Sequence, residues 1–233
     1  MQEMSQQNSE KIGSGKSLVI GYGEIGKALT KILREHYRVD TWDINSGIEP
    51  LGNYDIMHIC FPYSNKFIDY VKAYQAKYEP KFTVIHSTVP LGTSRECNAI
   101  HSPIRGLHPN LESGIRTFVK FLGGEQSSEV ADYFRRAGLR VCLFDRQENS
   151  EALKLWDTTQ YLESVRMTKR IKKYCIKHNL SFSDIYRIGN LTYNQGYQEL
   201  GHPEYTRPVL EPIMTEIGGH CLTPNEELLK LSE

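Results

Sequence analysis

A glycine-rich turn between a short apolar strand and an amphipathic helix constrains the fold of this chain more than any other feature. An apolar run over 17–20 leads directly into Gly21-Tyr22-Gly23-Glu24-Ile25-Gly26, and helical apolar spacing continues over 25–36. In a G-x-G-x-x-G turn the first glycine permits the tight bend, the second lets the backbone approach a pyrophosphate, and the third lets the helix pack on the strand. The helix N-terminus adds free N–H groups and a positive dipole. Residues 21–26 are therefore predicted to bind a dinucleotide.

An acidic residue follows the second predicted strand, which covers 37–42. Asp43 lies 22 positions after Gly21, where a carboxylate accepts hydrogen bonds from the adenosine ribose. A carboxylate there repels a 2′-phosphate, so NAD is favoured over NADP. Asp40 is a weaker candidate because it lies inside the strand. The alternative interpretation is a glycine-rich turn that caps the helix and binds no ligand.

Strands and helices alternate along most of the chain. Further strands are expected over 56–61, 83–86, 104–107, 118–122 and 140–144, and further helices over 65–78 and 127–137. This alternation predicts an α/β fold, a Rossmann-type doubly wound parallel sheet followed by a smaller helical region. Helical patterns over 150–178, 181–198 and 225–231 make up that region. The expected organisation is a disordered tail (1–15), an NAD-binding Rossmann domain (16–148) and a helical substrate and dimerisation region (149–233).

Composition excludes several classes of protein. Lys and Arg number 28 and Asp and Glu number 28, so a broad basic surface for nucleic acid is not expected. No run of 18 apolar residues is present and the first residues are polar, which predicts a cytoplasmic protein without a membrane span or signal peptide. The cysteines form no C-x-x-C pair, which argues against a disulfide framework and a metal site. We expect four of them to be buried: Cys60, Cys97, Cys142 and Cys175.

Three further segments carry a resemblance to a known family. Phe61-Pro62 ends the third strand, 86–93 reads H-S-T-V-P-L-G-T, and 217–224 reads I-G-G-H-C-L-T-P. Together they resemble the UDP-glucose/GDP-mannose dehydrogenase family, particularly the G-G-H-C form of bacterial UDP-N-acetylmannosamine-type dehydrogenases. The resemblance implies an NAD-dependent oxidoreductase that oxidises an alcohol, and on to the acid through a cysteine thioester.

The resemblance also implies catalytic residues. Cys221 matches the nucleophile that attacks the intermediate aldehyde, and Lys154, in Glu151-Ala152-Leu153-Lys154-Leu155, matches a lysine that stabilises an oxyanion. Thr158 stands where the family has asparagine. Pro109 stands where the family has a glutamate, and the neighbouring His108 is the candidate general base. The alternatives are a buried filler cysteine, a surface lysine and a loop histidine bonded to backbone.

Binding residues follow in the same way. Phe61, Pro62 and Thr88 are expected to contact the cofactor, and Asn110, Arg207 and His220 the substrate. Arg207 resembles a family arginine that reaches across a dimer, so we expect a homodimer formed through the long helix from Ser150. Alternatively, Thr88 bonds its local backbone and Arg207 is a solvated loop residue.

The nature of the substrate is left open. Family members continue past the cysteine segment into a second nucleotide-type domain, whereas this sequence stops at Glu233. We therefore expect a small-molecule substrate that is either a sugar nucleotide or another alcohol. Two other functions fit the residues: a prephenate-dehydrogenase or β-hydroxyacid-type reductase in which Lys154 acts as acid–base and Cys221 is incidental, and a non-catalytic NAD-binding protein.

Overall fold

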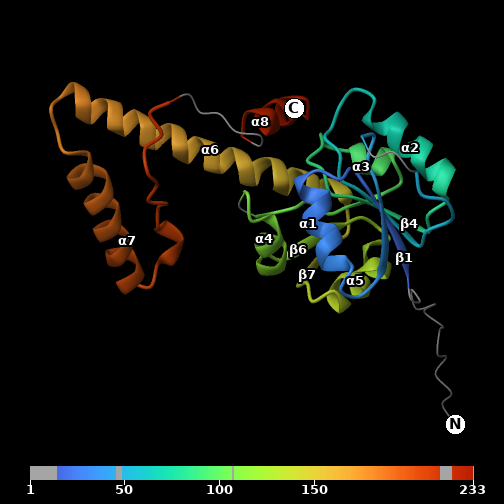
Figure 1. The fold of residues 1–233 in the computed structure, drawn as a ribbon. Coiled ribbons are helices and arrows are strands. Elements are labelled where there is room, and N and C mark those ends of the chain that lie inside the picture. The colour runs from blue at the N-terminus through green and yellow to red at the C-terminus, as the bar shows by residue number, and fades with distance from the viewer. Residues whose placement is uncertain (1–14, 46–48, 107, 216–221, 233) are drawn as a thin grey trace, which may run out of the picture. The chain divides into compact units, whose positions relative to one another are not determined.

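The computed structural model describes residues 15–45, 49–106, 108–215 and 222–232. Contacts within the chain divide it into two units, with the boundary between Lys154 and Leu155. This boundary falls inside the longest helix, α6 (Gln147–Lys177), which begins in the first unit and continues into the second (Figure 1).

The first unit is built on a seven-stranded sheet with the order β2-β1-β3-β4-β5-β6-β7. Its strands are β1 (Lys16–Ile20), β2 (Arg38–Trp42), β3 (Ile56–Ile59), β4 (Phe82–Ile85), β5 (Ile100–His101), β6 (Lys120–Gly123) and β7 (Val141–Phe144). All neighbouring pairs are parallel except β5 and β6, which are antiparallel. The α/β, Rossmann-type prediction is confirmed. The chain reverses its direction of winding between β1 and β3, which in such sheets opens a ligand crevice at the carboxyl ends of the strands.

Helices cover both faces of this sheet (Figure 1). They are α1 (Glu24–Leu33), α2 (Phe67–Tyr78), α3 (Thr93–Glu96), α4 (Leu111–Thr117) and α5 (Ser127–Arg136). Successive residues of a strand point to opposite faces. Val19 therefore packs with side chains of α1, α4 and α5 in one apolar cluster, while its neighbour Leu18 packs with α2 in the other.

Helix α1 begins within the glycine-rich segment 21–26. Gly23 is its N-cap, Glu24 lies in its first turn and Lys31 in its last, so both charges complement the helix dipole. Leu29, Ile32 and Leu33 are fully buried on the sheet. This face fixes the direction in which the N-terminus of the helix points.

The second unit is helical. Besides the later part of α6 it contains a π-helical segment η1 (Ser183–Ile188), α7 (Gly189–Glu199), a short 3-10 helix η2 (Pro203–Tyr205) and α8 (Leu222–Lys230). The hydroxyl of Tyr186 lies 2.8 Å from Thr168 Oγ1 and donates to the carbonyl of Pro208 at 3.2 Å, which ties η1 and the following loop to α6. Within the described ranges, none of the helices combines the length and the apolar character needed to cross a membrane.

Some sequence predictions were wrong. Residues 104–106 form no strand, and residue 107 lies outside the described residues; Pro103 precedes them and has no N–H for a sheet hydrogen bond. The sheet continues instead through β5, whose two residues were not predicted, and α3 and α4 were not predicted either. Cys60, Cys97 and Cys175 are buried as expected, but Cys142 is exposed because β7 is an edge strand with a neighbour on one side only.

Substitution of Ile59 by alanine tests the core assignment. Ile59 is fully buried on the central strand β3, so Ile59→Ala is expected to lower the free energy of unfolding by about 2 to 5 kcal/mol. Ile44→Ala, the same change at a side chain that is 86% exposed, is expected to change it by less than about 0.5 kcal/mol. Urea denaturation measures both, and equal effects would contradict the assignment.

Candidate functional site

The glycine turn lies at the switch point of the sheet, between the ends of β1 and β3. Gly21 has a positive φ of 92°, and a Cβ on it would lie 2.8 Å from the carbonyl carbon of Cys60. A Cβ on Gly26 would lie 1.9 Å from the carbonyl oxygen of Gly21. Only glycine fits at these two positions, because backbone atoms occupy the space of a side chain.

Gly23 differs from the other two glycines. No described atom lies within 4 Å of the position that its Cβ would take. The N-terminus of α1 begins at this residue and directs its first amides outward. Packing therefore requires glycine at positions 21 and 26, while Gly23 leaves open space next to the N-terminus of α1. Open space beside a helix N-terminus suits an anionic phosphate group.

Asp43 is tied directly to this turn. One carboxylate oxygen accepts a hydrogen bond from the Tyr22 amide at 2.7 Å, and the other accepts from the Asn45 amide at 3.0 Å. The Asn45 and Tyr22 hydrogen bonds hold the pKa of Asp43 below its usual range. Asp43 is thus ionised, and its Oδ1 also accepts from the Asn45 side-chain amide at 3.1 Å. Asp40 is engaged elsewhere, by Lys16 and Tyr54.

The structure brings together Glu24 and His108, which the sequence did not pair. His108 Nδ1 lies 2.6 Å from Glu24 Oε2. The contact joins the start of α1 to the loop that carries Pro109 and Asn110. The imidazole ring thus contacts the acidic side chain in the first turn of α1.

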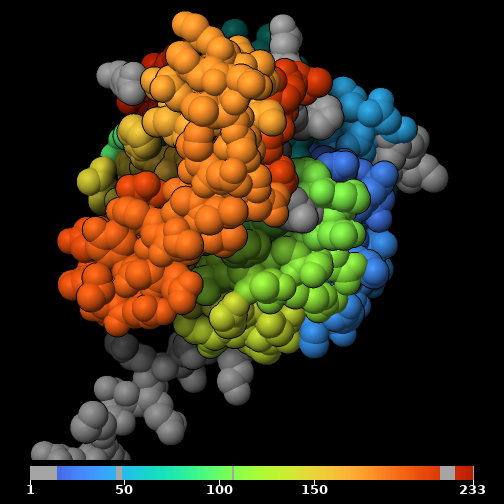
Figure 2. Space-filling model, turned by 90° about the vertical axis from the view of Figure 1, so that its left-hand side faces the viewer, coloured from blue at the N-terminus to red at the C-terminus, as the bar shows by residue number. Residues whose placement is uncertain are grey.

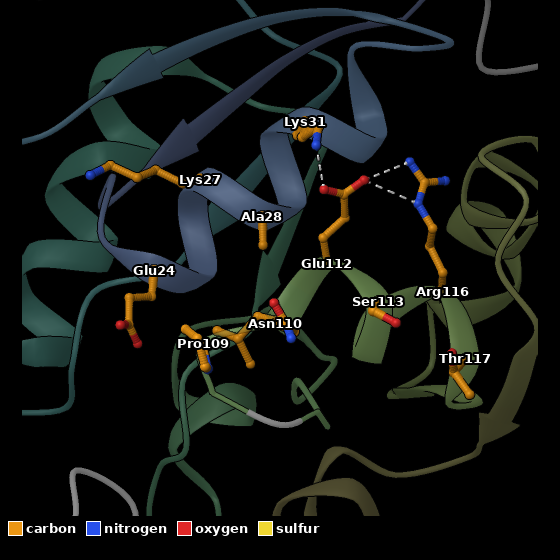
Figure 3. Close-up of a pocket in the computed structure, with 11 residues that line it drawn as sticks. Glu24, Lys27, Ala28, Lys31, Pro109, Asn110, Glu112, Ser113, Arg116 and Thr117 are labelled. Atoms are coloured by element: carbon orange, nitrogen blue, oxygen red, sulfur yellow. Dashed lines mark hydrogen bonds and ion pairs between the residues drawn. The ribbon is translucent and has the colours of Figure 1, made fainter.

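A groove runs between α1 and α4, and Figure 3 shows its lining. Its volume is about 630 Å³, and Asn110 is one of the residues that line it. Glu112 accepts from Lys31 at 2.7 Å and from Arg116 at 3.3 Å, and Arg116 also pairs with Glu35, so the two cations are balanced by two carboxylates. Lys27 extends from α1, with its ammonium 5.9 Å from the centre of the Tyr22 ring.

Hydrogen bonds hold the two loops that follow β3 and β4. Ser87 Oγ donates to the Phe61 carbonyl at 2.5 Å, and His101 Nε2 donates to the Ser87 carbonyl at 3.2 Å. Pro62 is exposed and Thr88 is half-buried. The loops that contain the predicted cofactor contacts Phe61, Pro62 and Thr88 are therefore adjacent in space, next to the glycine turn.

Glu151, which the sequence indicated only as a neighbour of Lys154, fixes the loop that follows β4. Its fully buried carboxylate accepts from the amides of Gly92 at 2.6 Å and Ser94 at 2.8 Å. Burial raises the pKa of Glu151, while the amide hydrogen bonds favour its ionised form. No local pattern in the sequence indicates this contact, because 59 residues separate Glu151 from Gly92.

Lys154 is half-buried, one turn after Glu151 on α6. Its charge contributes to lowering the pKa of the buried His101 to about 3, although burial is the main cause. Lys154 therefore lies close enough to β5 to act electrostatically on His101.

Thr158, on the next turn of α6, belongs to the second unit. Its hydroxyl donates to the Leu155 carbonyl at 2.9 Å and accepts from Asn225 Nδ2 at 3.3 Å. Asn225 is a buried residue of α8 that sequence reasoning missed. A bidentate ion pair of Arg166 with Glu226, both contacts 2.8 Å, also holds α8 on α6.

Of the remaining predicted residues, Arg207 belongs to the second unit, and the other two fall outside the described residues. Arg207 is exposed in the second unit, with its guanidinium 3.7 Å from the Tyr193 ring centre. It lines a cavity of about 520 Å³ together with α6 residues such as Met167. His220 and Cys221 fall outside the described residues.

Comparisons with known proteins place this fold among dehydrogenases of solved structure. Neither protein-family models nor curated proteins gave a match. The UDP-D-ManNAc dehydrogenase of Pyrococcus horikoshii is similar, with a TM-score of 0.74 and 16% identity over 92% of this chain and 63% of that one. The NDP-N-acetyl-D-galactosaminuronic acid dehydrogenase of Methanosarcina mazei is similar as well, with a TM-score of 0.68 and 18% identity over 93% of this chain and 60% of that one. For the 3-hydroxyisobutyrate dehydrogenase of Mycobacterium tuberculosis, the TM-score is 0.62 and the identity is 13%, over 75% of this chain and 69% of that one.

These similarities establish the fold. The chain spans less than two thirds of the length of the two nucleotide-sugar enzymes, at 63% and 60%. All three identities are low, so the substrates in the names of those proteins remain statements about those proteins.

Alanine substitutions at Gly26 and Gly23 distinguish packing from open space. Gly26→Ala is expected to lower the free energy of unfolding by about 1 to 3 kcal/mol, because its Cβ meets the Gly21 carbonyl. Gly23→Ala, the matched control, is expected to cost less than about 1 kcal/mol. Thermal and urea denaturation give both values. A larger loss for Gly23→Ala than for Gly26→Ala would contradict the geometry of the turn.

Proposed function

We propose that this chain is an NAD-dependent oxidoreductase that acts on an alcohol group, of the nucleotide-sugar 6-dehydrogenase type. The observation that carries the proposal is the turn at 21–26: open space at Gly23, a helix N-terminus beside it, and the ionised Asp43 bonded to the Tyr22 amide. The fold shared with dehydrogenases of solved structure supports the same conclusion.

The residues present fit the two ends of a dinucleotide. The amides of 21–26 would hold the pyrophosphate, and Asp43 would accept from the adenosine ribose and oppose a 2′-phosphate. The adjacent loops with Phe61, Pro62 and Thr88 would border the nicotinamide half. When bound, NAD supplies the hydride acceptor.

Lys154 and Cys221 would carry the chemistry on the substrate. The ammonium of Lys154 stabilises negative charge on the substrate oxygen as the alcohol is oxidised. The Cys221 thiolate then adds to the aldehyde carbon; after the second hydride leaves that carbon, water hydrolyses the resulting thioester to the acid and releases the thiolate. His108 is the candidate base for that water, and it is oriented by Glu24 at 2.6 Å.

The position of α8 supports a role for the segment before it. Helix α8 begins directly after Cys221 in the sequence and is fixed on α6 by Asn225 at Thr158 and by Glu226 at Arg166. Thr158 is the residue one turn beyond Lys154. The described part of the C-terminal segment is thus anchored to the helix that carries the proposed oxyanion-stabilising residue.

A homodimer formed through the second unit is part of the proposal. Its helices, orange in Figure 2, carry large apolar side chains that are at least half exposed, which is unusual for a surface that stays in water. They include Tyr161, Met167, Tyr174, Ile176, Ile188 and Leu191. A second copy of the helices would bury them, and Arg207 would then be available as a substrate contact.

A β-hydroxyacid dehydrogenase is the second candidate. The fold is similar to that of the 3-hydroxyisobutyrate dehydrogenase, which this chain matches over 75% of its length. In that case Lys154 is the acid–base residue, the 108–110 loop binds the substrate, and Cys221 has no catalytic role.

Cofactor titrations test the dinucleotide site. The wild type is expected to bind NADH more tightly than NADPH. Gly23→Ala is expected to weaken NADH binding by about tenfold or more, because a methyl group enters the space for the pyrophosphate. Asp43→Asn keeps an oxygen for the Tyr22 amide but removes the charge, so it should raise the affinity for NADPH relative to NADH. Fluorescence titration measures these affinities; no binding of either nucleotide would contradict the proposal.

Product analysis of Cys221→Ser separates the two candidate reactions. If Cys221 forms a thioester, the variant oxidises the alcohol but acid formation falls by at least about a hundredfold. Cys60→Ser serves as the matched control, because Cys60 is a buried core residue. Chromatography of products with candidate sugar nucleotides and hydroxy acids gives the readout. Full activity of Cys221→Ser would favour the β-hydroxyacid alternative and contradict the thioester.

A further inference from the structure

A chain of buried polar side chains crosses the core between the sheet and α5. Ser17 Oγ lies 2.8 Å from the Tyr133 hydroxyl, which lies 3.3 Å from His58 Nε2, and His58 Nδ1 lies 3.0 Å from His86 Nε2. The four side chains are at most 1% exposed. None of them has a part in the proposed reaction.

The direction of these hydrogen bonds follows from one carbonyl group. His86 Nδ1 lies 2.7 Å from the Ser102 carbonyl oxygen, which only accepts, so we assign a proton to Nδ1. His86 Nε2 then accepts from His58 Nδ1, and His58 Nε2 accepts from the Tyr133 hydroxyl. Both imidazoles are neutral in this arrangement. Burial agrees with it, since it lowers the pKa of His58 to about 3 and holds the pKa of His86 well below its ordinary value.

Lys120, the first residue of β6, ends this chain. Its Nζ lies 3.3 Å from His86 Nδ1 and 3.5 Å from the Ser102 carbonyl, with the Phe134 ring centre 5.0 Å away. As an amine, Lys120 can share the Nδ1 proton that His86 donates to the Ser102 carbonyl; as an ammonium, it faces that donor and can donate only to the carbonyl. Burial lowers the pKa of Lys120 to about 7. Its charge is therefore the one in this cluster that changes near neutral pH.

No anion in the described residues neutralises the ammonium of Lys120. The titratable groups around it are His58 and Cys60 of β3, His86 after β4, His101 of β5 and Tyr133 of α5. The histidines are neutral, and burial raises the pKa of the Cys60 thiol to about 12 and also raises the pKa of Tyr133. A nearby bound anion would thus meet an uncompensated positive charge.

Backbone hydrogen bonds connect this cluster to the glycine turn. The His86 amide donates to the Ile59 carbonyl at 2.9 Å, and the Cys60 amide donates at 2.8 Å to the carbonyl of Ile20, which directly precedes Gly21. The Cys60 carbonyl carbon lies 2.8 Å from the position of a Cβ on Gly21. Charges separated by packed protein rather than water interact strongly and are little screened by salt. The phosphates of a dinucleotide on the turn would be the anion that Lys120 lacks.

We propose that Lys120 couples dinucleotide binding to the uptake of one proton from solvent, so that affinity for the dinucleotide falls as the pH rises. The inference rests on the proposed dinucleotide site. Below about pH 7 Lys120 is charged before binding, and no proton is taken up. Above it the free protein holds the amine and the complex the ammonium, so Kd rises with pH by up to about tenfold per unit.

Calorimetric titration with NADH in buffers of different ionisation enthalpy tests this coupling. At about pH 8 the wild type is expected to take up between half and one proton per NADH, and at about pH 6 close to none. Lys120→Met should bind NADH with equal Kd at both pH values and take up no proton. Lys72→Met, the same change at an exposed lysine of α2, should behave as the wild type.

The outcomes separate this inference from the function on which it rests. NADH binding without proton uptake at about pH 8, or uptake that persists in Lys120→Met, would overturn the role of Lys120 and leave the dinucleotide site intact. Failure of the wild type to bind NADH at either pH would overturn the proposed function and the coupling with it.

Unfolding of the wild type gives a second measurement that needs no variant. The folded pKa of Lys120 is lowered, so the unfolded chain binds more protons and stability rises with pH. We expect the free energy of unfolding to increase between about pH 7 and about pH 8, below the ordinary pKa of cysteine thiols. A flat or falling profile in this range would contradict the titration of Lys120.

Discussion

The end of β1 lies so close to the end of β3 that no side chain fits between them. A Cβ on Gly21 would lie within 2.8 Å of two backbone atoms of Cys60 and Phe61, directly after β3, and one on Gly26 would lie 1.9 Å from the Gly21 carbonyl oxygen. This packing fixes the path of the turn and the direction of α1. As a consequence, Gly23 faces open space. The proposed ligand position is therefore set by the backbone packing at Gly21 and Gly26.

Buried and partly buried hydrogen bonds then give the surrounding loops their shape. Asp43 bonds the Tyr22 amide, Ser87 bonds the Phe61 carbonyl, and Glu151 bonds the amides of Gly92 and Ser94. Breaking such a buried pair leaves an unsatisfied group at a cost of about 1 to 3 kcal/mol, so the loops have little freedom to rearrange. The buried Lys120 adds a charge that no described side chain neutralises. Shape and charge at this edge of the sheet thus both suit a bound anion.

Local patterns in the sequence predicted the elements that local physics determines. The apolar run before Gly21 and the helical spacing after Ile25 predicted β1 and α1, because strand and helix periods depend on near neighbours. The strand expected over 104–107 was wrong because Pro103 ends the ladder. The exposure of Cys142 depends on β7 lying at the sheet edge, which no local pattern contains.

Contacts between distant residues were beyond sequence reasoning. Glu24 meets His108, Glu151 meets Gly92, Asn225 meets Thr158, and each pair is more than fifty positions apart. The resemblance selected Lys154, His108 and Thr158 for chemistry, and the structure adds the partners Glu24 and Asn225. Roles for Cys221 and His220 stay predictions, since both fall outside the described residues.

Amide NMR of the glycine turn tests the central claim most directly. In a titration of ¹⁵N-labelled protein with NADH, the account predicts saturable shifts of the Gly21, Gly23 and Gly26 amide signals, while those of Gly189 and Gly196 in the second unit stay unchanged. Turn signals that remain in place when NADH is saturating, or that move no more than those of the second unit, would contradict it.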